Sequence, residues 1–167
     1  MIIISLGSNV TSLWGNPSTT ILRACEELDS AAIGIIRLSA LYRTSPYGIT
    51  DQPVFVNAAA VIDTALSATG LLSVLSSLRW GPRPLDLDII DYKAQVFNWY
   101  KRKRHRLGYA SPTLILPHPE VQSRLFVLCP LQDIAPSWHH PVTGASVSQL
   151  LAKLNFKNEG KILDRLR

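Results

Sequence analysis

The sequence predicts an α+β protein in which helices pack on one mainly antiparallel sheet. Short apolar runs bounded by turn-forming residues alternate with segments whose apolar residues recur at helical spacing. Along the chain these segments give the order strand, helix, strand, strand, helix, strand. That order is the split βαβ arrangement of a ferredoxin-like α/β sandwich, in which helices cover the sheet.

The first strand and helix are expected near the start of the chain. Ile2 to Leu6 form an apolar run that ends at Gly7-Ser8-Asn9, which indicates a buried strand followed by a turn. Asn16 and Pro17 suit the N-cap and first position of a helix. Apolar residues then follow at helical spacing, at Ile21, Leu22, Cys25 and Leu28.

Two strands and a second helix are expected next. Residues Ile33 to Thr44 and Val54 to Thr64 are rich in β-branched and aromatic side chains, and turn-forming residues separate them. Ser67 is expected to cap a helix from about Ala68 to Leu78. Four leucines of this helix share one face, at positions 71, 72, 75 and 78.

The rest of the chain supplies a fourth strand, a hairpin and two more helices. Leu85 to Tyr92 is the expected strand, and Ala94 to Trp99 should pair with it as a hairpin. Val121 to Ile134 and Ser146 to Leu154 are expected to be helical. Because no repeat, linker or shift in composition interrupts the sequence, we expect residues 1–167 to form one domain.

Composition excludes several classes of protein. A hydrophobic fraction of 47% with 17% charged residues is globular rather than disordered. No apolar run approaches the ~20 residues of a membrane span, and the start lacks a basic signal-peptide region. A cytoplasmic location without a membrane partner is therefore expected. Cys25 and Cys129 stand in apolar runs and are expected to be buried free thiols.

A net charge of +5 favours anionic partners, which are either nucleic acid or phosphorylated small molecules. The strongest local signal is RWGPRPLDLDI, residues 79–89. Because side chains alternate along a strand, Asp86 and Asp88 share one face, ~7 Å apart, opposite the apolar residues. Like charges repel there unless a cation intervenes, and Mg²⁺ takes one or two carboxylates plus phosphate oxygens. The alternative is an exposed strand face with surface ion pairs.

Three other groups of residues suit binding. Arg79 and Arg83 flank Trp80 and Gly81-Pro82 just before the acidic pair, and arginine binds phosphate in bidentate fashion. Phe55 and Asn57 are two residues apart on a predicted strand, so an aromatic ring and an amide share a face, as suits a flat heterocycle. A core phenylalanine with a strand-end asparagine is the structural alternative.

The third group is Leu116-Pro117-His118-Pro119, followed by Arg124 and Phe126. A histidine between prolines sits in a rigid loop and could donate to a phosphate oxygen. A purely structural histidine is the alternative.

Together these segments resemble the 6-hydroxymethyl-7,8-dihydropterin pyrophosphokinases. The family's motifs occur in its order from about Ile2 to Leu151: SLGSN, YRTxPxG, DQPxFxNAA, RWGPRPLDLDI, LPHP and RxFVLxPLxxIAP. The arginine-to-aspartate motif is highly specific, whereas SLGSN and LPHP are weak alone. The resemblance implies the same ferredoxin-like fold, and transfer of the β,γ-diphosphate of ATP to the pterin hydroxymethyl group with release of AMP, in folate biosynthesis.

The resemblance also implies roles for individual residues. Asp86 and Asp88 would hold two Mg²⁺ ions and, with Arg83, would be the catalytic residues. The ATP side would consist of Arg79, Trp80, Arg83, Ile89, His118 and Arg124. The pterin side would consist of Thr44, Tyr47, Phe55, Asn57, Asp86 and Phe126, with the two phenylalanines sandwiching the ring. A monomer that binds no nucleic acid is expected.

The chain departs from the family in two places. The family has a long loop before RWGPR, whereas here Leu78 runs straight into Arg79. Either the protein lacks this loop, or the sequence omits a segment. A basic run at Lys101 to Arg106 is expected to be a solvated hairpin tip. An inactive pyrophosphokinase paralogue and a basic ferredoxin-like RNA-binding module remain as alternatives.

Overall fold

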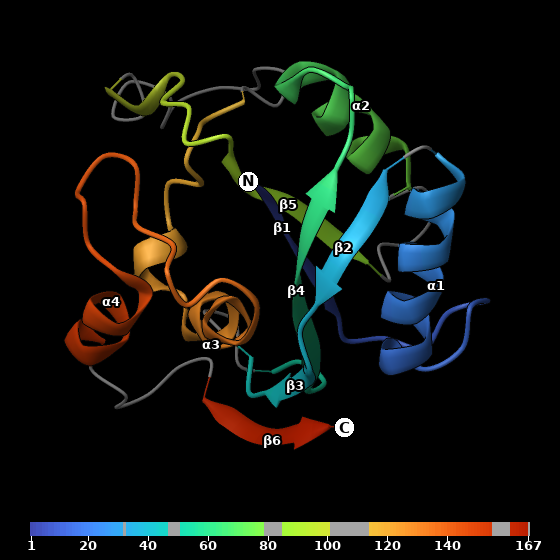
Figure 1. The fold of residues 1–167 in the computed structure, drawn as a ribbon. Coiled ribbons are helices and arrows are strands. Elements are labelled where there is room, and N and C mark those ends of the chain that lie inside the picture. Colours follow the sequence, from blue (N-terminus) through green and yellow to red (C-terminus); the bar gives the residue numbers. More distant parts are fainter. Residues whose placement is uncertain (32, 47–50, 79–84, 101–113, 155–160, 167) are drawn as a thin grey trace.

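An antiparallel sheet runs through the centre of the molecule (Figure 1). The computed structural model describes residues 1–31, 33–46, 51–78, 85–100, 114–154 and 161–166. Within these ranges the sheet has six strands in the order β5-β1-β4-β3-β6, and β2 also pairs with β4. The strands are β1 (Ile2–Ser8), β2 (Gly34–Leu38), β3 (Leu41–Thr44), β4 (Phe55–Asp63), β5 (Asp86–Tyr92) and β6 (Ile162–Leu166).

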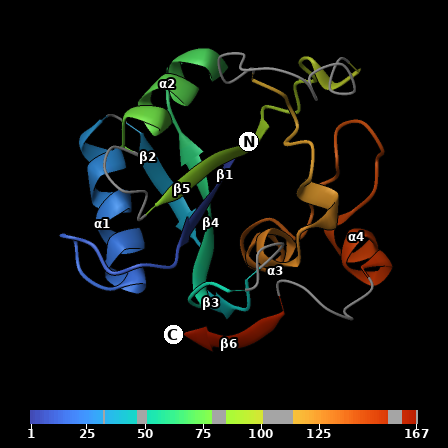
Figure 2. The ribbon, with the colours of Figure 1, turned by 180° about the vertical axis from the view of Figure 1, so that it is seen from behind.

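Helices cover both faces of the sheet, as Figures 1 and 2 show from opposite sides. One face carries α1 (Pro17–Ser30) and α2 (Ala68–Leu78), and the other carries α3 (Leu125–Ile134) with α4 (Val147–Lys153) beside it. The element order from β1 to β5 is strand, helix, strand, strand, helix, strand once β2 and β3 count as one interrupted strand. The predicted ferredoxin-like α+β arrangement is therefore confirmed.

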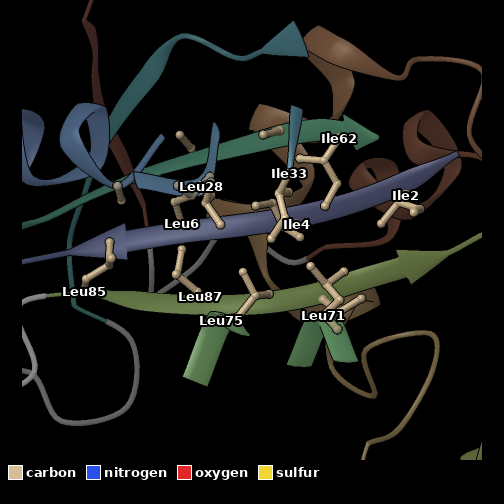
Figure 3. Packing of buried hydrophobic residues seen from close by; sticks show 14 of the residues in the cluster. Ile2, Ile4, Leu6, Leu28, Ile33, Ile62, Leu71, Leu75, Leu85 and Leu87 are labelled. Atoms are coloured by element: carbon tan, nitrogen blue, oxygen red, sulfur yellow. The ribbon is translucent and has the colours of Figure 1, made fainter. Parts of the chain in front are cut away.

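Alternation along β1 divides the core into two layers. Ile2, Ile4 and Leu6 point toward α1 and α2, where they pack with leucines of both helices (Figure 3). Ile3 points the other way, into a second buried cluster with α3 and α4. Ser5 and Gly7 share the face of Ile3, because residues two apart on a strand lie on one side. Ser5 and Gly7 therefore lie on the face of the sheet that carries α3, where they interrupt the apolar surface.

The predicted helix caps are present. The Asn16 side chain accepts a hydrogen bond from the Thr19 N–H at 3.0 Å, with Pro17 at the first helical position. The Ser67 hydroxyl accepts from the Gly70 N–H at 3.1 Å at the start of α2. These caps satisfy backbone donors that a helix start leaves open, which explains why both boundaries followed from the sequence.

The strand expected over residues 33–44 is two strands. Between β2 and β3, the Ser39 hydroxyl accepts from the Ala59 N–H at 3.0 Å while its own N–H donates to the Ala59 carbonyl at 2.9 Å. A side chain therefore replaces one bond of the β-ladder, and the strand is interrupted. A register shift between Ile35 and Arg37 adds a local irregularity in β2.

The expected hairpin of residues 94–99 with the fourth strand is wrong. Lys93 and Ala94 adopt positive φ values of 53° and 56°, and the Asp91 carboxylate accepts from the Ala94 N–H at 2.8 Å. This turn leads the chain away from β5, so that Phe97 forms an isolated bridge with Leu116 instead.

The helix expected over residues 121–134 is interrupted. A 3-10 turn at Val121–Ser123 ends at Arg124, which is extended (φ −108°, ψ 101°) and serves as the N-cap of α3. Its carbonyl accepts from the N–H groups of Val127 and Leu128 at 3.1 and 3.0 Å. The break places the Arg124 side chain at the end of α3 rather than along its length.

Strand β6 was not predicted. It pairs with β3 in antiparallel register, with Leu41 opposite Leu166. The Asp133 carboxylate of α3 links the two strands, because it accepts from the Tyr42 hydroxyl at 2.9 Å and from Arg165 at 3.0 Å. These tertiary contacts join a short segment that has little strand signal of its own.

Both cysteines are free, as expected, but they are half-buried rather than buried. Burial, followed by the nearby Glu26 carboxylate, raises the pKa of Cys25 to about 11. In the described part of the chain no helix has the length and apolar character needed to cross a membrane.

Candidate active site

Three adjacent strands bring polar residues into line on the face that carries α3. Gly7 of β1 lies opposite Asn57 of β4 on one side and opposite Asp86 of β5 on the other. Two residues earlier on β1, Ser5 lies opposite Asp88 of β5. Because the register is set by backbone hydrogen bonds, the amide and the two carboxylates have fixed positions relative to one another.

These residues form the floor of a cavity of about 200 Å³. Its walls come from β3, the start of β4 and the first turn of α3. The lining residues are Ser5, Leu6, Gly7, Thr44, Ser45, Phe55, Asn57, Asp86, Asp88, Arg124, Phe126 and Val127. Six residues predicted from the sequence are therefore brought to one place on the described surface, at positions 44, 55, 57, 86, 88 and 126, together with Arg124 from the predicted ATP side.

The two aspartates stand on the site face of β5, as the alternation predicted. Asp86 is exposed and Asp88 is half-buried, whereas Leu87 between them is buried on the opposite face. Asp88 Oδ2 is 4.0 Å from Nε2 of His118 and 3.9 Å from Nη1 of Arg124. One end of the cavity thus combines carboxylates with a guanidinium and an imidazole.

His118 is held in a defined orientation beside Asp88. Its backbone N–H donates to the Ile90 carbonyl of β5 at 2.9 Å, and its Nδ1 accepts from the Glu120 N–H at 3.2 Å. Since Nδ1 is an acceptor, the proton of the neutral ring lies on Nε2, the atom that faces Asp88. Burial lowers the pKa of His118 against the opposing effect of the Asp88 carboxylate, and Arg124 lowers it further.

Arg124 connects the two ends of the cavity. It pairs with Glu120 four residues earlier and approaches Asp88, while its guanidinium stands 5.6 Å from the centre of the Phe126 ring. Stacking on an aromatic ring and pairing with carboxylates both hold the planar group in place. Glu120 was not predicted as a site residue, although an acid four positions before an arginine is a recognisable pairing pattern.

The other end of the cavity is aromatic and amide in character. Phe55 and Asn57 share the site face of β4, and Phe126 approaches from α3. Asn57 is 6% exposed, and its Nδ2 donates to the hydroxyl of the buried Thr44 at 2.8 Å. This end offers a donor and an acceptor beside aromatic surface, which suits the edge of a flat heterocycle.

One predicted residue is placed elsewhere. The Ile89 side chain is 4% exposed and packs in the cluster under α1 and α2, on the opposite face from Asp86 and Asp88. Strand alternation explains this, because Ile89 is one residue from Asp88. A nucleotide contact by this residue would have to come from its main chain.

Several predictions fall outside the described residues. These concern Arg79, Trp80, Arg83, Tyr47, the basic run Lys101 to Arg106 and the junction that follows Leu78. Within the described ranges no group of three or more His, Cys, Asp or Glu side chains is arranged to hold a metal ion. Five residues line the cavity without having been predicted as site residues: Ser5, Leu6, Gly7, Ser45 and Val127. The first three belong to the SLGSN motif.

The fold and the cavity define an α+β sandwich protein whose site has a charged end and an aromatic–amide end. Comparison with known proteins assigns the family. The profile of the 7,8-dihydro-6-hydroxymethylpterin-pyrophosphokinase (HPPK) family matches residues 3–136, and the chain belongs to this family.

Two bacterial relatives resemble the chain over nearly its whole length. Both are 2-amino-4-hydroxy-6-hydroxymethyldihydropteridine pyrophosphokinases. The protein of Methylorubrum extorquens is 38% identical over 164 residues, covering 91% of this chain and 92% of the relative. That of Pseudomonas aeruginosa is 34% identical over 167 residues, covering 93% of each. Each alignment is longer than the stretch of this chain that it covers, so the relatives carry residues without a counterpart here.

Solved structures show the same fold. The wild-type HPPK-DHPS of Plasmodium falciparum, crystallised with pteroate, superposes with a TM-score of 0.69 at 17% identity. The match covers 91% of this chain but 42% of the chain in that structure, so this chain spans less than half of its length.

Proposed function

We propose that this chain transfers the β,γ-diphosphate of ATP to the hydroxymethyl group of 6-hydroxymethyl-7,8-dihydropterin and releases AMP, in folate biosynthesis. The observation that carries the proposal is the row Asn57, Gly7, Asp86 across three neighbouring strands. It sets a heterocycle-binding amide and a carboxylate two strands apart, roughly 10 Å between their backbones. A pterin ring bound at the amide would therefore extend its hydroxymethyl group toward the acidic end.

The residues of each end have distinct roles in this proposal. Phe55 and Phe126 bind the faces of the pterin ring, and Asn57 pairs with its amide edge, with Thr44 holding the asparagine. Arg124 and the Nε2–H of His118 bind phosphate oxygens of ATP at the other end. Arg79, Trp80 and Arg83 are proposed for the nucleotide side, and Tyr47 for the pterin side, from their places in the family motifs.

The reaction is an in-line displacement at phosphorus. The hydroxymethyl oxygen attacks the β-phosphorus, a new O–P bond forms, the bridge between the α- and β-phosphorus breaks, and AMP leaves with that bridging oxygen. The hydroxyl proton passes to solvent or to a nearby base. Such a reaction depends mainly on orientation and on neutralisation of phosphate charge. Arg124 supplies positive charge at this end of the site, and the neutral ring of His118 supplies a hydrogen-bond donor.

We further propose that Asp86 and Asp88 hold two Mg²⁺ ions when ATP is bound. Two hard oxygen donors on one strand face, open to a cavity, fit a cation that completes its coordination with water and phosphate oxygens. When bound, the ions would neutralise phosphate charge. Residues 1–167 are proposed to act as a single, monomeric, cytoplasmic domain.

One assay tests the proposal. The chain is incubated with ATP, MgCl₂ and 6-hydroxymethyl-7,8-dihydropterin, and the products are separated by anion exchange. Formation of AMP and the pterin diphosphate in equal amounts, dependent on pterin, is the expected result. Formation of ADP would indicate transfer of one phosphoryl group and contradict the proposal. Absence of any product would identify an inactive paralogue.

A further inference from the structure

The glycine at the centre of the site has a steric role that its backbone does not explain. Gly7 does not adopt the positive φ that favours glycine, so its conformation is open to any residue. A Cβ built on Gly7 would, however, stand 3.0 Å from Oδ1 of Asn57. Outside its chain neighbours this Cβ would meet no other described atom within 4 Å. The space in front of Gly7 is therefore the cavity itself, bordered on one side by the Asn57 amide.

The Asn57 amide has little freedom to move away from a side chain at position 7. It is 6% exposed, and its Nδ2 is held at 2.8 Å by the hydroxyl of Thr44, which is 1% exposed. With a Cβ at 3.0 Å from Oδ1, the amide would have to shift by a few tenths of an ångström, which would strain its bond to Thr44. The same Cβ would also stand between Asn57 and Asp86, which flank Gly7 on the neighbouring strands.

We infer that Gly7 is a positioning residue that determines specificity for the heterocycle. Its missing side chain keeps the Asn57 amide in its binding orientation and leaves the sheet bare where a flat ring lies. The inference rests on the proposed pterin site. It predicts that an added methyl group at position 7 discriminates against the pterin and not against the nucleotide, which binds at the charged end.

The test compares Gly7→Ala with Gly34→Ala. Gly34 lies in β2, which pairs with the same strand β4. Among the described atoms a Cβ there would meet only the Asp63 carbonyl, at an ordinary 3.8 Å. Binding of 6-hydroxymethylpterin and of a non-hydrolysable ATP analogue with Mg²⁺ is measured by calorimetry. Gly7→Ala should raise the pterin Kd roughly tenfold or more, because it misplaces a buried polar partner, and change the analogue's Kd by less than about twofold. Gly34→Ala should change neither.

Two measurements on the free protein make the test independent of the ligand. In ¹⁵N–¹H spectra, Gly7→Ala should shift the Asn57 side-chain amide signals and Gly34→Ala should not. In thermal unfolding, Gly7→Ala should lower the Tm of the wild-type protein. It should hardly lower the Tm of the Asn57→Ala variant, because the atom that the new Cβ contacts, Asn57 Oδ1, is absent there. This second comparison also applies if Gly7→Ala alone is too unstable for binding studies.

The outcomes distinguish the steric role of Gly7 from the assignment of the pterin site. An unchanged pterin Kd in Gly7→Ala, or an equal loss of Tm with and without Asn57, would overturn the role of Gly7. If the wild-type protein fails to bind hydroxymethylpterin while the Asn57 signals still shift in Gly7→Ala, the steric coupling stands and the pterin assignment is overturned.

Discussion

Replacing Asp86 by asparagine should separate metal binding from fold stability. Asp86 is exposed and contributes no side chain to the core, and it shares a strand face with Asp88, ~7 Å away. Two carboxylates at that distance repel by about 0.6 kcal/mol in water and about 2.4 kcal/mol at an effective dielectric constant of ~20. Without Mg²⁺, the variant should therefore be as stable as the wild type or slightly more stable.

With Mg²⁺ and an ATP analogue present, the wild type should instead be more stable than Asp86→Asn. The wild type should gain Tm by binding, whereas Asp86→Asn should gain much less, and its turnover should fall by roughly 100-fold or more, as for loss of a group that stabilises transition-state charge. Unfolding is followed by calorimetry across a Mg²⁺ titration, and turnover by AMP release. Asp63→Asn, at the far end of β4 in the same sheet, is the matched control. Near-normal turnover of Asp86→Asn at limiting Mg²⁺ would refute the metal assignment.

Three further predictions concern Asn57, Tyr42 and the basic run of the sequence. Asn57→Ala should raise the pterin Kd by roughly 5- to 100-fold and leave the ATP-analogue Kd within about twofold in calorimetry, and equal losses for both ligands would contradict its assignment. Tyr42→Phe should lower the free energy of unfolding by roughly 1–2 kcal/mol, measured in urea, because Asp133 loses one donor. Burial and the Asp133 hydrogen bond raise the pKa of Tyr42 to about 12, so the stability linked to this proton is complete below pH ~10 and is lost as the pH approaches 12; Tyr42→Phe should lack this loss. Neutralising Lys101 to Arg106 should leave turnover nearly unchanged and weaken retention on heparin, and a large loss of turnover would show that the run reaches the site.

The sequence predicted those parts of the fold whose signals are local. Capping residues such as Asn16 and Ser67 mark helix starts because the side chain bonds to a backbone N–H a few residues away. The face of β5 that carries Asp86 and Asp88 followed from alternation alone. These features need no knowledge of what packs where, so they can be predicted before the structure is known.

The features that were missed depend on distant partners. The break at Ser39 needs the backbone of Ala59, twenty residues away, and β6 needs both β3 and Asp133. Ile89 was assigned to the nucleotide side by family resemblance, and its side chain packs under α1 and α2, as strand alternation predicts. Gly7 was not predicted as a site residue because its role depends on the space that its missing side chain leaves beside Asn57, a residue fifty positions away in the sequence.

The central position of β1 has a consequence for how the site moves. Because β1 is hydrogen-bonded to β4 on one side and to β5 on the other, amide protons around Ser5 and Gly7 should exchange with solvent only when the whole sheet opens. The floor of the cavity is then among the slowest-exchanging parts of the protein. Within the part of the chain that the structure describes, adjustment to a ligand is expected from side chains above the floor, such as Arg124 and Phe126, while the floor keeps its spacing.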